Sequence, residues 1–381
     1  MTKVLLVAGE ASGDQHAATL IRQTQKTSEH PIDFFGIGGD ECQQAGMRII
    51  QDYRALNVMG ITAIITKIPS ILYCYRLIKR SLEQQKPNCL VLVDFAGFNL
   101  KVAKLAKRFG IPVFYYIPPK VWAWKSKRIK LIQRYVDHVA CIFPFERDIY
   151  EKHQVSCSIV PNPVVEQLSQ LASSTQAEKT KSKSWTIALV PGSRPNEIKY
   201  CLPILLNAAK EINMEHTTSI RWIMPLAPTL ELQTIKKTLD QYQLSLDLIP
   251  SEQRYQAYQD ADIALATSGT VTLELSLLNT PMIVIYRMSW FTQWLAERWV
   301  KIPFVSLCNI LLQKPTVTEL IRLKDANSKK LALACNRLLA SEPLRKQQQQ
   351  DFSTLKAILD PDQYPNVGQC LKQFIDRECY L

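Results

Sequence analysis

The sequence lacks the cysteine spacing and the apolar runs that mark several large protein classes. Its ten cysteines form no CxxC pair, so neither a zinc site nor a disulfide framework is predicted, and we expect reduced, buried thiols. No run of about 18 uncharged apolar residues occurs, so no membrane-spanning helix is expected. A strand pattern begins within three residues of the start, which predicts no signal peptide. Together these absences favour a cytoplasmic protein.

Acidic residues are also scarce. The chain has 34 Asp and Glu against 46 Lys and Arg, a formal net charge of +12. An excess of this size indicates anionic partners: a nucleic acid, a phosphorylated metabolite or an anionic membrane surface. Apolar residues make up 47% of the 381 residues, which is enough to build hydrophobic cores. The length predicts two domains of roughly 150–200 residues each.

Short apolar strands alternate with helices in both halves of the chain. Uninterrupted apolar strands separated by helices predict parallel sheets with helices on both faces. The expected fold class is α/β, with two Rossmann-like, doubly wound domains and ligands in a cleft between them. The strands are expected at residues 3–8, 33–37, 89–93, 112–117 and 138–143, and then at 185–190, 220–224, 244–249, 262–267 and 282–286.

One polar segment divides the two series. Residues 171–184 are polar and basic and have no apolar period, as in a linker. We therefore expect an N-terminal domain at 1–170 and a second domain at 185–345. Residues 346–381 are helical and polar in pattern, and they could pack back on the first domain.

A turn at Pro191 to Arg194 joins a strand to a helix that begins near Asn196. Gly192 and Ser193 leave backbone N–H groups at a helix N-terminus, which favours an anion. Arg194 adds a guanidinium group that suits a diphosphate. An ordinary turn that carries a surface arginine is the competing interpretation.

A second loop of the same kind lies downstream. Ser268, Gly269 and Thr270 follow a strand and open a helix, where hydroxyl and N–H groups can bind an anion. Glu274 lies one turn further on the same helical face, where a carboxylate can accept hydrogen bonds from both ribose hydroxyls. A first-turn residue that complements the helix dipole is the alternative. Two such loops with a carboxylate behind one of them predict a site for a nucleotide diphosphate.

The first half carries a glycine-rich segment at residues 9–14 (GEASGD). It is neither GxGxxG nor a Walker loop, so neither NAD nor ATP is predicted. Its glycines allow a ligand to approach the backbone closely, which makes Ser12 and Gly13 candidate binding residues. Asp14 could instead cap a helix.

Asp94 directly follows the buried strand at 89–93. Transfer of a sugar from a nucleotide needs a base for the acceptor hydroxyl, and a partly desolvated carboxylate suits that role. An aspartate that merely forms a turn is the alternative. Glu10, Asp14 and Glu197 are rival carboxylates.

Two segments combine cations with apolar or aromatic side chains. Residues 101–134 carry ten Lys and Arg, no Asp or Glu, and aromatic residues that include Trp122 and Trp124. Residues 60–80 are rich in Ile, Leu and Tyr and contain the cations Lys67, Arg76, Lys79 and Arg80. Such segments favour an anionic membrane surface, or a nucleic acid for the first of them. The alternative for residues 101–134 is a solvated basic face, and the alternative for residues 60–80 is a core helix with a basic exposed edge. The aromatic stretch 286–300 could likewise belong to a membrane interface or to the core.

Together these motifs resemble those of the lipid-A-disaccharide synthases. Each motif is weak alone, whereas the ordered set from Gly9 to about Glu319 is specific. The matching stretches are 9–14 (GEASGD), 121–124 (VWAW), 143–146 (FPFE), 191–194 (PGSR) with Glu197, 268–270 (SGT) with Glu274, and Asn309 before an apolar pair.

The resemblance implies a GT-B fold and an inverting glycosyltransferase that needs neither a metal nor a cofactor. It implies UDP-2,3-diacylglucosamine as the donor and 2,3-diacylglucosamine 1-phosphate (lipid X) as the acceptor. The products would be the β-1,6-linked lipid A disaccharide 1-phosphate and UDP. The first domain would face the acceptor and the inner membrane of a Gram-negative bacterium, and the second would bind the UDP-sugar. No nucleic-acid partner is implied, and a homodimer is left open.

The chemistry of the motifs, together with the resemblance, assigns roles to residues. Asp94 and Arg194 would be catalytic. The membrane and acceptor surface would include Lys67, Arg76, Lys79, Arg80, Trp122 and Trp124. The residues that bind UDP or substrate would be Gly192, Ser193, Arg194, Glu197, Ser268, Gly269, Thr270, Glu274, Ser12, Gly13 and Asn309.

Some positions depart from the family pattern. These departures bear on acceptor preference and activity rather than on the fold. The departures are Ala96 for proline, Pro118 and Lys120 in a segment that is commonly Ser-Pro-Gln, Asn162 for histidine, and Arg322 for glutamine.

Two alternatives remain: another UDP-sugar enzyme of the same architecture, such as a UDP-N-acetylglucosamine epimerase, or a non-enzymatic protein that binds membranes or nucleic acids.

Overall fold

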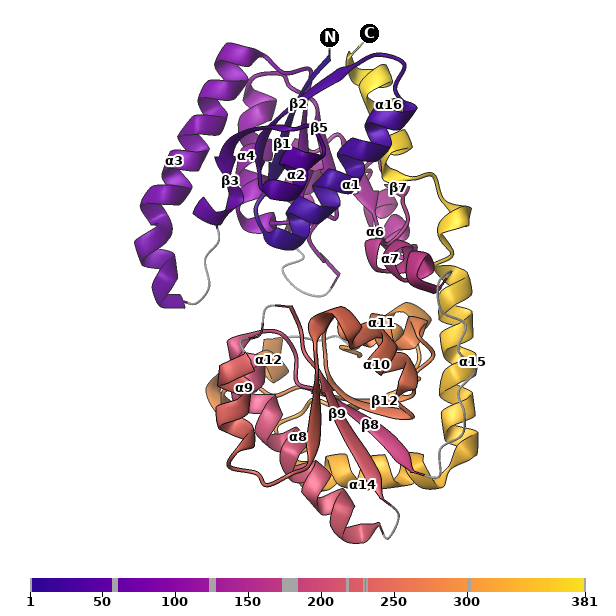
Figure 1. Ribbon diagram of the computed structural model, residues 1–381. Helices are drawn as coiled ribbons and strands as arrows, with labels where there is room; N and C mark the ends of the chain where they lie inside the picture. The colour runs from indigo at the N-terminus through magenta and orange to yellow at the C-terminus, as the bar shows by residue number, and fades with distance from the viewer. Residues whose placement is uncertain are drawn as a thin grey trace. The chain divides into compact units, whose positions relative to one another are not determined.

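The chain forms two compact units (Figure 1). One comprises Met1–Glu166 with Leu359–Leu381, and the other comprises Gln167–Ile358. The computed structural model describes residues 2–56, 61–122, 128–172, 184–216, 219–228, 230, 232–299 and 303–379. Most of the expected linker at 171–184 therefore lies outside the described residues.

The first unit is built on a seven-stranded parallel sheet in the order β3-β2-β1-β4-β5-β6-β7. Its strands are β1 (Thr2–Ala8), β2 (Ile32–Gly38), β3 (Arg48–Asp52), β4 (Cys89–Val93), β5 (Val113–Tyr116), β6 (His138–Cys141) and β7 (Cys157–Ile159). Its helices are α1 (Ala11–Thr27), α2 (Asp40–Gln44), α3 (Ile61–Gln85), α4 (Ala96–Arg108), α5 (Arg128–Tyr135), α6 (Glu146–Lys152) and α16 (Val367–Cys379), and α7 (Pro163–Ala172) spans the boundary at Glu166.

Alternate residues of the central strands enter two separate cores. Leu5 and Leu92 pack with α3, α4 and α5 on one face of the sheet, while Leu6 and Val91 pack with α1 and α16 on the other. Because side chains of a strand alternate between faces, a strand that is apolar throughout must be covered on both. The uninterrupted apolar runs of the sequence thus become the buried centre of a three-layer unit.

The second unit has a six-stranded parallel sheet in the order β10-β9-β8-β11-β12-β13. Its strands are β8 (Trp185–Val190), β9 (Ile220–Pro225), β10 (Leu246–Ile249), β11 (Ile263–Thr267), β12 (Met282–Ile285) and β13 (Thr318–Leu320). Its helices are α8 (Pro195–Glu215), α9 (Leu232–Leu239), α10 (Arg254–Asp260), α11 (Val271–Leu277), α12 (Trp290–Trp299), α13 (Leu307–Leu312), α14 (Ser328–Ala340) and α15 (Glu342–Ile358).

The expected α/β class with two doubly wound parallel sheets is confirmed, but three strands were missing from the prediction. These are β3, β7 and β13, which lie at sheet edges. Their residues are mostly half-buried or exposed, so they lack the apolar run that marks a central strand.

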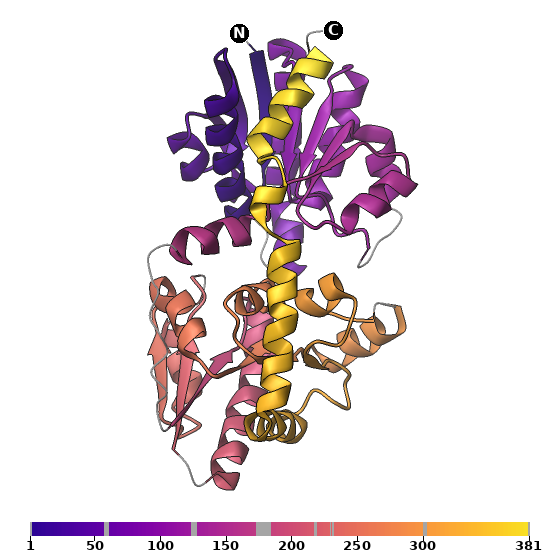
Figure 2. The ribbon, with the colours of Figure 1, turned by 90° about the vertical axis from the view of Figure 1, so that its right-hand side faces the viewer.

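The last two helices belong to different units. The side chain of Gln348 in α15 accepts a hydrogen bond from the Met282 backbone N–H at 2.9 Å, and Phe352 and Leu355 are buried. These contacts keep α15 with the second unit, so the boundary lies at Leu359 rather than at residue 346. Only α16 belongs to the first unit, where it packs on α1 (Figure 2).

The contact between α16 and α1 depends on Gly368. A Cβ atom at this position would lie 2.4 Å from the backbone of Gln23 and of Thr24. The Gly368 N–H also donates to the Gln23 side chain at 3.3 Å. The two helices therefore approach more closely here than any residue with a side chain allows.

We expect Gly368→Ala to destabilise the first unit by about 1–3 kcal/mol, because the added methyl group forces α16 away from α1. The control is Gly97→Ala in α4, where nothing lies within 4 Å of the added atom, and its effect should stay within about 1 kcal/mol of zero. Urea unfolding followed by circular dichroism measures both. Equal midpoints for the two variants would contradict this account of the helix contact.

Candidate active site

Asp94 lies at the carboxyl end of β4, in a turn whose backbone is held from two sides. Its carbonyl oxygen accepts hydrogen bonds from the Tyr115 hydroxyl at 2.7 Å and from the Asn99 side chain at 2.9 Å. Asp94 and Phe95 both adopt left-handed φ values, 47° and 43°. Burial raises the pKa of the Asp94 carboxyl, while the Phe95 N–H and the charge of Lys120 lower it. The sheet thus presents a half-buried carboxylate at the carboxyl end of its middle strand.

The glycine-rich segment at 9–14 packs against the same turn. A Cβ atom at Gly9 would lie 2.3 Å from the Phe95 ring, so the Phe95 side chain itself accounts for this glycine. Ser12 is exposed and Gly13 is buried in the first turn of α1. The segment therefore braces the Asp94 turn and leaves Ser12 at the surface.

Asp14 caps a helix, but a different helix from the one expected. Its carboxylate accepts the backbone N–H groups of Gly39, Glu41 and Cys42 at 2.7, 3.1 and 3.3 Å, which places it at the start of α2. The side chain is only 3% exposed. The suggestion that Asp14 is a rival catalytic base is therefore corrected, because its carboxylate oxygens already accept three backbone N–H groups inside the unit.

The basic surface of the first unit is only partly described. Arg76, Lys79 and Arg80 are exposed on α3, and on the same helix Leu72 and Tyr73 are 47% and 56% exposed. Other α3 residues pack in the core, so α3 is at once a core helix and a basic apolar edge. Trp124 and the side chain of Lys67 lie outside the described residues. The Trp122 indole donates to the Glu146 carboxylate at 3.0 Å.

In the second unit, the loop at Pro191 to Arg194 follows β8. Gly192 has φ +98°, and a Cβ atom there would lie 2.3 Å from a Glu197 oxygen. The Glu197 carboxylate accepts the N–H groups of Ser193 at 2.9 Å and Arg194 at 3.2 Å. The expectation that these two N–H groups are open to a ligand is therefore corrected: a buried carboxylate of α8 occupies them. The Arg194 side chain is 78% exposed, with a nitrogen 3.6 Å from Glu197.

The loop at Ser268 to Thr270 lies beside this one, because β11 and β8 are paired neighbours. The Thr267 hydroxyl donates to the Val190 carbonyl at 3.2 Å and joins the two strand ends. The Ser268 hydroxyl donates to the Val305 carbonyl at 2.9 Å. Gly269 and Thr270 are exposed, and nothing lies within 4 Å of a Cβ built on Gly269. The structure thus brings the two predicted loops together.

Glu274 faces two residues that the sequence analysis did not single out. Burial raises the pKa of its carboxyl, while the charge of Arg254 and a hydrogen bond from Tyr255 lower it. The Arg254 guanidinium lies 4.0 Å from the centre of the Tyr255 ring and donates to its hydroxyl at 2.6 Å. No local motif marks this pair, because only the packing of α10 brings it to Glu274.

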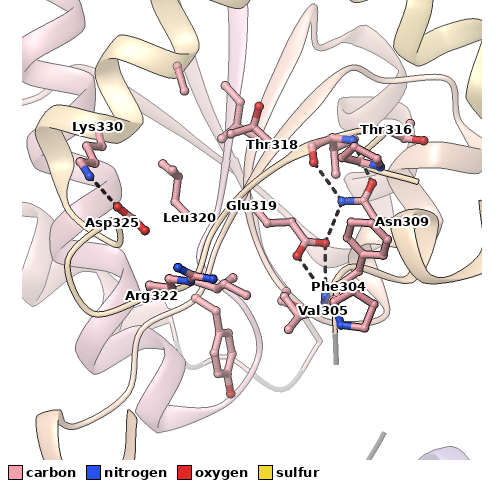
Figure 3. A pocket seen from close by; sticks show the side chains of 18 of the residues that line it. Phe304, Val305, Asn309, Thr316, Thr318, Glu319, Leu320, Arg322, Asp325 and Lys330 are labelled. Carbon is pink, nitrogen blue, oxygen red and sulfur yellow. Dashed lines mark hydrogen bonds and ion pairs between the residues drawn. The ribbon is translucent and has the colours of Figure 1, made fainter. Parts of the chain in front are cut away.

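Asn309 is 1% exposed, and its amide is fully used within the chain. It donates to the Val317 carbonyl and to the Glu319 carboxylate, both at 2.9 Å, and accepts from the Val317 N–H (Figure 3). Glu319 in turn accepts the N–H groups of Val305 and Ser306. Asn309 therefore orients Glu319, which holds the segment that Ser268 contacts.

Glu319 and Arg322 line a groove of about 1760 Å³ at the β13 edge of this unit (Figure 3). Arg322 is exposed there.

In the first unit, Asn162 is buried and its side chain accepts the Val164 N–H at 3.0 Å, so it caps α7. Among the residues that the structure describes, no cluster of three His, Cys, Asp or Glu side chains is arranged to hold a metal ion. No described helix combines the length and the apolar character needed to cross a membrane.

Comparison with known proteins supports the resemblance found in the motifs. Residues 4–374 match the family model described as lipid-A-disaccharide synthetase. The lipid-A-disaccharide synthase of Nitrosococcus oceani is 37% identical over 356 residues, which cover 93% of this chain and 91% of the relative. Lipid-A-disaccharide synthase 1 of Legionella pneumophila (strain Lens) is 38% identical over 342 residues, which cover 87% and 86%.

Solved structures that share the fold are more distant in sequence. The calicheamicin glycosyltransferase CalG4 superposes with a TM-score of 0.61 at 11% identity, over 99% of both chains. The MnaA–UDP structure from S. aureus gives 0.60 at 12% identity, over 96% of this chain and 99% of that one. The predicted GT-B fold is confirmed, and the chain belongs to the lipid-A-disaccharide synthetase family of glycosyltransferases.

Proposed function

We propose that the protein transfers 2,3-diacylglucosamine from UDP-2,3-diacylglucosamine to the 6-hydroxyl of 2,3-diacylglucosamine 1-phosphate (lipid X). The products are the β-1,6-linked disaccharide 1-phosphate and UDP. The observation that carries the proposal is the pairing of the loops at Pro191 to Arg194 and Ser268 to Thr270 at neighbouring strand ends. The names of the similar family members support the choice of lipid substrates.

The diphosphate of the donor binds beside these two loops. Arg194 is exposed and supplies a guanidinium cation that is also 3.6 Å from a Glu197 oxygen. The exposed Gly269 and Thr270 supply polar groups of the second loop. Glu197 keeps the first loop in shape by accepting two of its N–H groups. Negative charge grows on the diphosphate as the sugar leaves, and a fixed cation stabilises that charge. In this proposal the reaction requires neither a metal nor a cofactor.

The ribose of the nucleotide binds at Glu274. Arg254 and Tyr255 lie against this carboxylate, and the charge of Arg254 favours its ionised form. An ionised carboxylate can accept hydrogen bonds from both ribose hydroxyls. Arg254 and Tyr255 are therefore assigned to orient Glu274.

Asp94 acts as the base. The oxygen of the acceptor 6-hydroxyl attacks the anomeric carbon from the face opposite the diphosphate, its proton passes to the Asp94 carboxylate, and UDP departs with the electron pair of the broken C–O bond. A half-buried carboxylate with a raised pKa is a stronger base than a solvated one. Asp94 belongs to the first unit and would act on the acceptor, whereas Arg194 belongs to the second unit and would act on the donor.

The acyl chains of both substrates stay in an anionic membrane, so we propose that the protein is peripheral to the inner membrane on its cytoplasmic side. The exposed apolar residues and cations of α3 supply the contact, since such a combination favours an anionic lipid surface.

Incubation of the purified protein with UDP-2,3-diacylglucosamine and lipid X should yield the disaccharide 1-phosphate, detected by mass spectrometry. Omission of either substrate should abolish the product. If UDP-N-acetylglucosamine alone is instead converted into an epimer, or if no product forms with any UDP-sugar, the proposed function is wrong.

Arg194→Ala should raise the barrier of this reaction by about 2–4 kcal/mol, because the growing charge on the diphosphate loses its cation. The matched control is Lys199→Ala, which removes an exposed cation from α8, the helix that begins directly after Arg194, and should leave turnover nearly unchanged. Initial rates at saturating substrate measure both. Near-normal turnover by Arg194→Ala would remove this residue from the site.

Asp94→Asn should bind UDP like the wild type in calorimetry but turn over about 10²–10⁴-fold more slowly. Burial raises the pKa of Asp94, so this base becomes protonated at a higher pH than an ordinary carboxyl group does. As the pH is lowered, the wild-type rate should therefore begin to fall at a pH above the usual carboxyl pKa. Asp14→Asn is the comparison: it should lower the unfolding midpoint and keep that acidic limb. A retained rate in Asp94→Asn would assign the base to another carboxylate.

A further inference from the structure

Glu146 is a carboxylate buried inside the first unit, at the start of α6. It is 2% exposed, and its two oxygens accept hydrogen bonds from different elements. One oxygen accepts the Trp122 indole N–H at 3.0 Å, and the other accepts the Phe143 backbone N–H at 3.3 Å. A buried charge is retained only when such partners compensate its desolvation.

The partners of Glu146 belong to an aromatic cluster around the segment 118–122. The Trp122 ring packs edge-on against Phe145, with ring centres 5.1 Å apart, and Phe145 stacks on Phe143 at 6.0 Å. The Tyr150 hydroxyl donates to the Pro119 carbonyl at 3.5 Å. Segment 118–122 is thus held near its start by Tyr150 of α6, which contacts Pro119, and at its end by Glu146 and Phe145, which contact Trp122.

Lys120 lies in the middle of this held segment and is exposed. Its charge lowers the pKa of two carboxyls, that of Asp94 at the end of β4 and that of Glu146. The charge of one ammonium group therefore acts on both carboxylates and favours their ionised forms. The position of Lys120 relative to Asp94 depends on the segment that Glu146 anchors.

We propose that Glu146 is a positioning residue that, by holding the Trp122 indole, keeps segment 118–122 in place and with it the Lys120 side chain, whose charge acts on the Asp94 carboxylate. The proposal rests on the proposed role of Asp94 as the base. Glu146 itself does not touch substrate. Its part is to fix the segment whose cation governs how readily Asp94 is ionised.

The surroundings of Glu146 place its titration near neutrality. Burial raises the pKa of Glu146 to about 7, against the opposing effects of the Trp122 and Phe143 donors and of Lys120. The other titratable groups that face it are Cys141 of β6, Tyr150 of α6 and Cys157 of β7. Protonation of Glu146 weakens its bond to the indole, so the anchor should weaken as pH falls through about 7.

The first experiment follows the Trp122 indole in the full-length chain without substrate. In protein labelled with ¹⁵N-tryptophan, the resonance assigned by Trp122→Phe should titrate with a midpoint near 7. Glu146→Gln should abolish this titration, and Lys120→Gln should move its midpoint upward, because loss of the cation favours the protonated acid. The matched control is Glu151→Gln, an exposed carboxylate of the same helix, which should change neither.

The second experiment measures kcat/KM of the transferase against pH. Lys120→Gln should move the acidic limb upward by on the order of half a pH unit, whereas Lys120→Arg keeps the cation and the limb. Glu146→Gln should lower kcat/KM by roughly 10-fold through a displaced segment, with normal UDP affinity.

An indole that still titrates in Glu146→Gln, or an acidic limb that Lys120→Gln leaves in place, would overturn the proposal. If the wild-type protein has no transferase activity, the proposed function fails, while the indole titration and its response to Lys120→Gln still decide whether Glu146 holds Trp122 beside Lys120.

Discussion

Helices cover both faces of each sheet, and this burial restricts where polar chemistry can occur. In the first unit the central strands send alternate side chains into two apolar cores. An unpaired charge on either face of that sheet would lose its hydration without compensation. Polar side chains and unpaired backbone groups are left to the turns at the strand ends. Asp94 after β4, the loop after β8 and the loop after β11 all occupy such turns. The arrangement of any site in this protein follows from which strands are neighbours.

A recurrent device in these turns is a buried or half-buried carboxylate that binds backbone N–H groups of its own chain. Asp14 does so at the start of α2, Glu197 in the loop after β8, and Glu319 in the segment before α13. Glu146 adds a side-chain donor, the indole of Trp122. Hydrogen bonds to an ionised acceptor are stronger than those between neutral groups, so each carboxylate can fix a loop that has little apolar surface of its own.

This device explains why the fold was easier to predict from the sequence than the site. Apolar runs and helix periods report burial directly, and only the half-exposed edge strands β3, β7 and β13 escaped them. Glu197 and Asn309 were both assigned to a ligand, because a motif gives the position of a polar side chain but not its direction. In the structure both turn inward, to the N–H groups of Ser193 and Arg194 and to Glu319. Arg254 and Tyr255 were missed because they reach Glu274 only through the packing of α10.

The return of α16 to the first unit has a consequence for the synthesis of the chain. Leu371 and Phe374 complete a core whose other members, such as Leu6 and Ala17, are made at the very beginning. The whole of Gln167–Ile358 is translated in between. At the ribosome, the part of the first sheet that α16 covers therefore stays exposed while the whole of the second unit has already been translated. The second unit is then the first that can fold completely, and the N-terminal sheet must avoid aggregation until its last helix arrives.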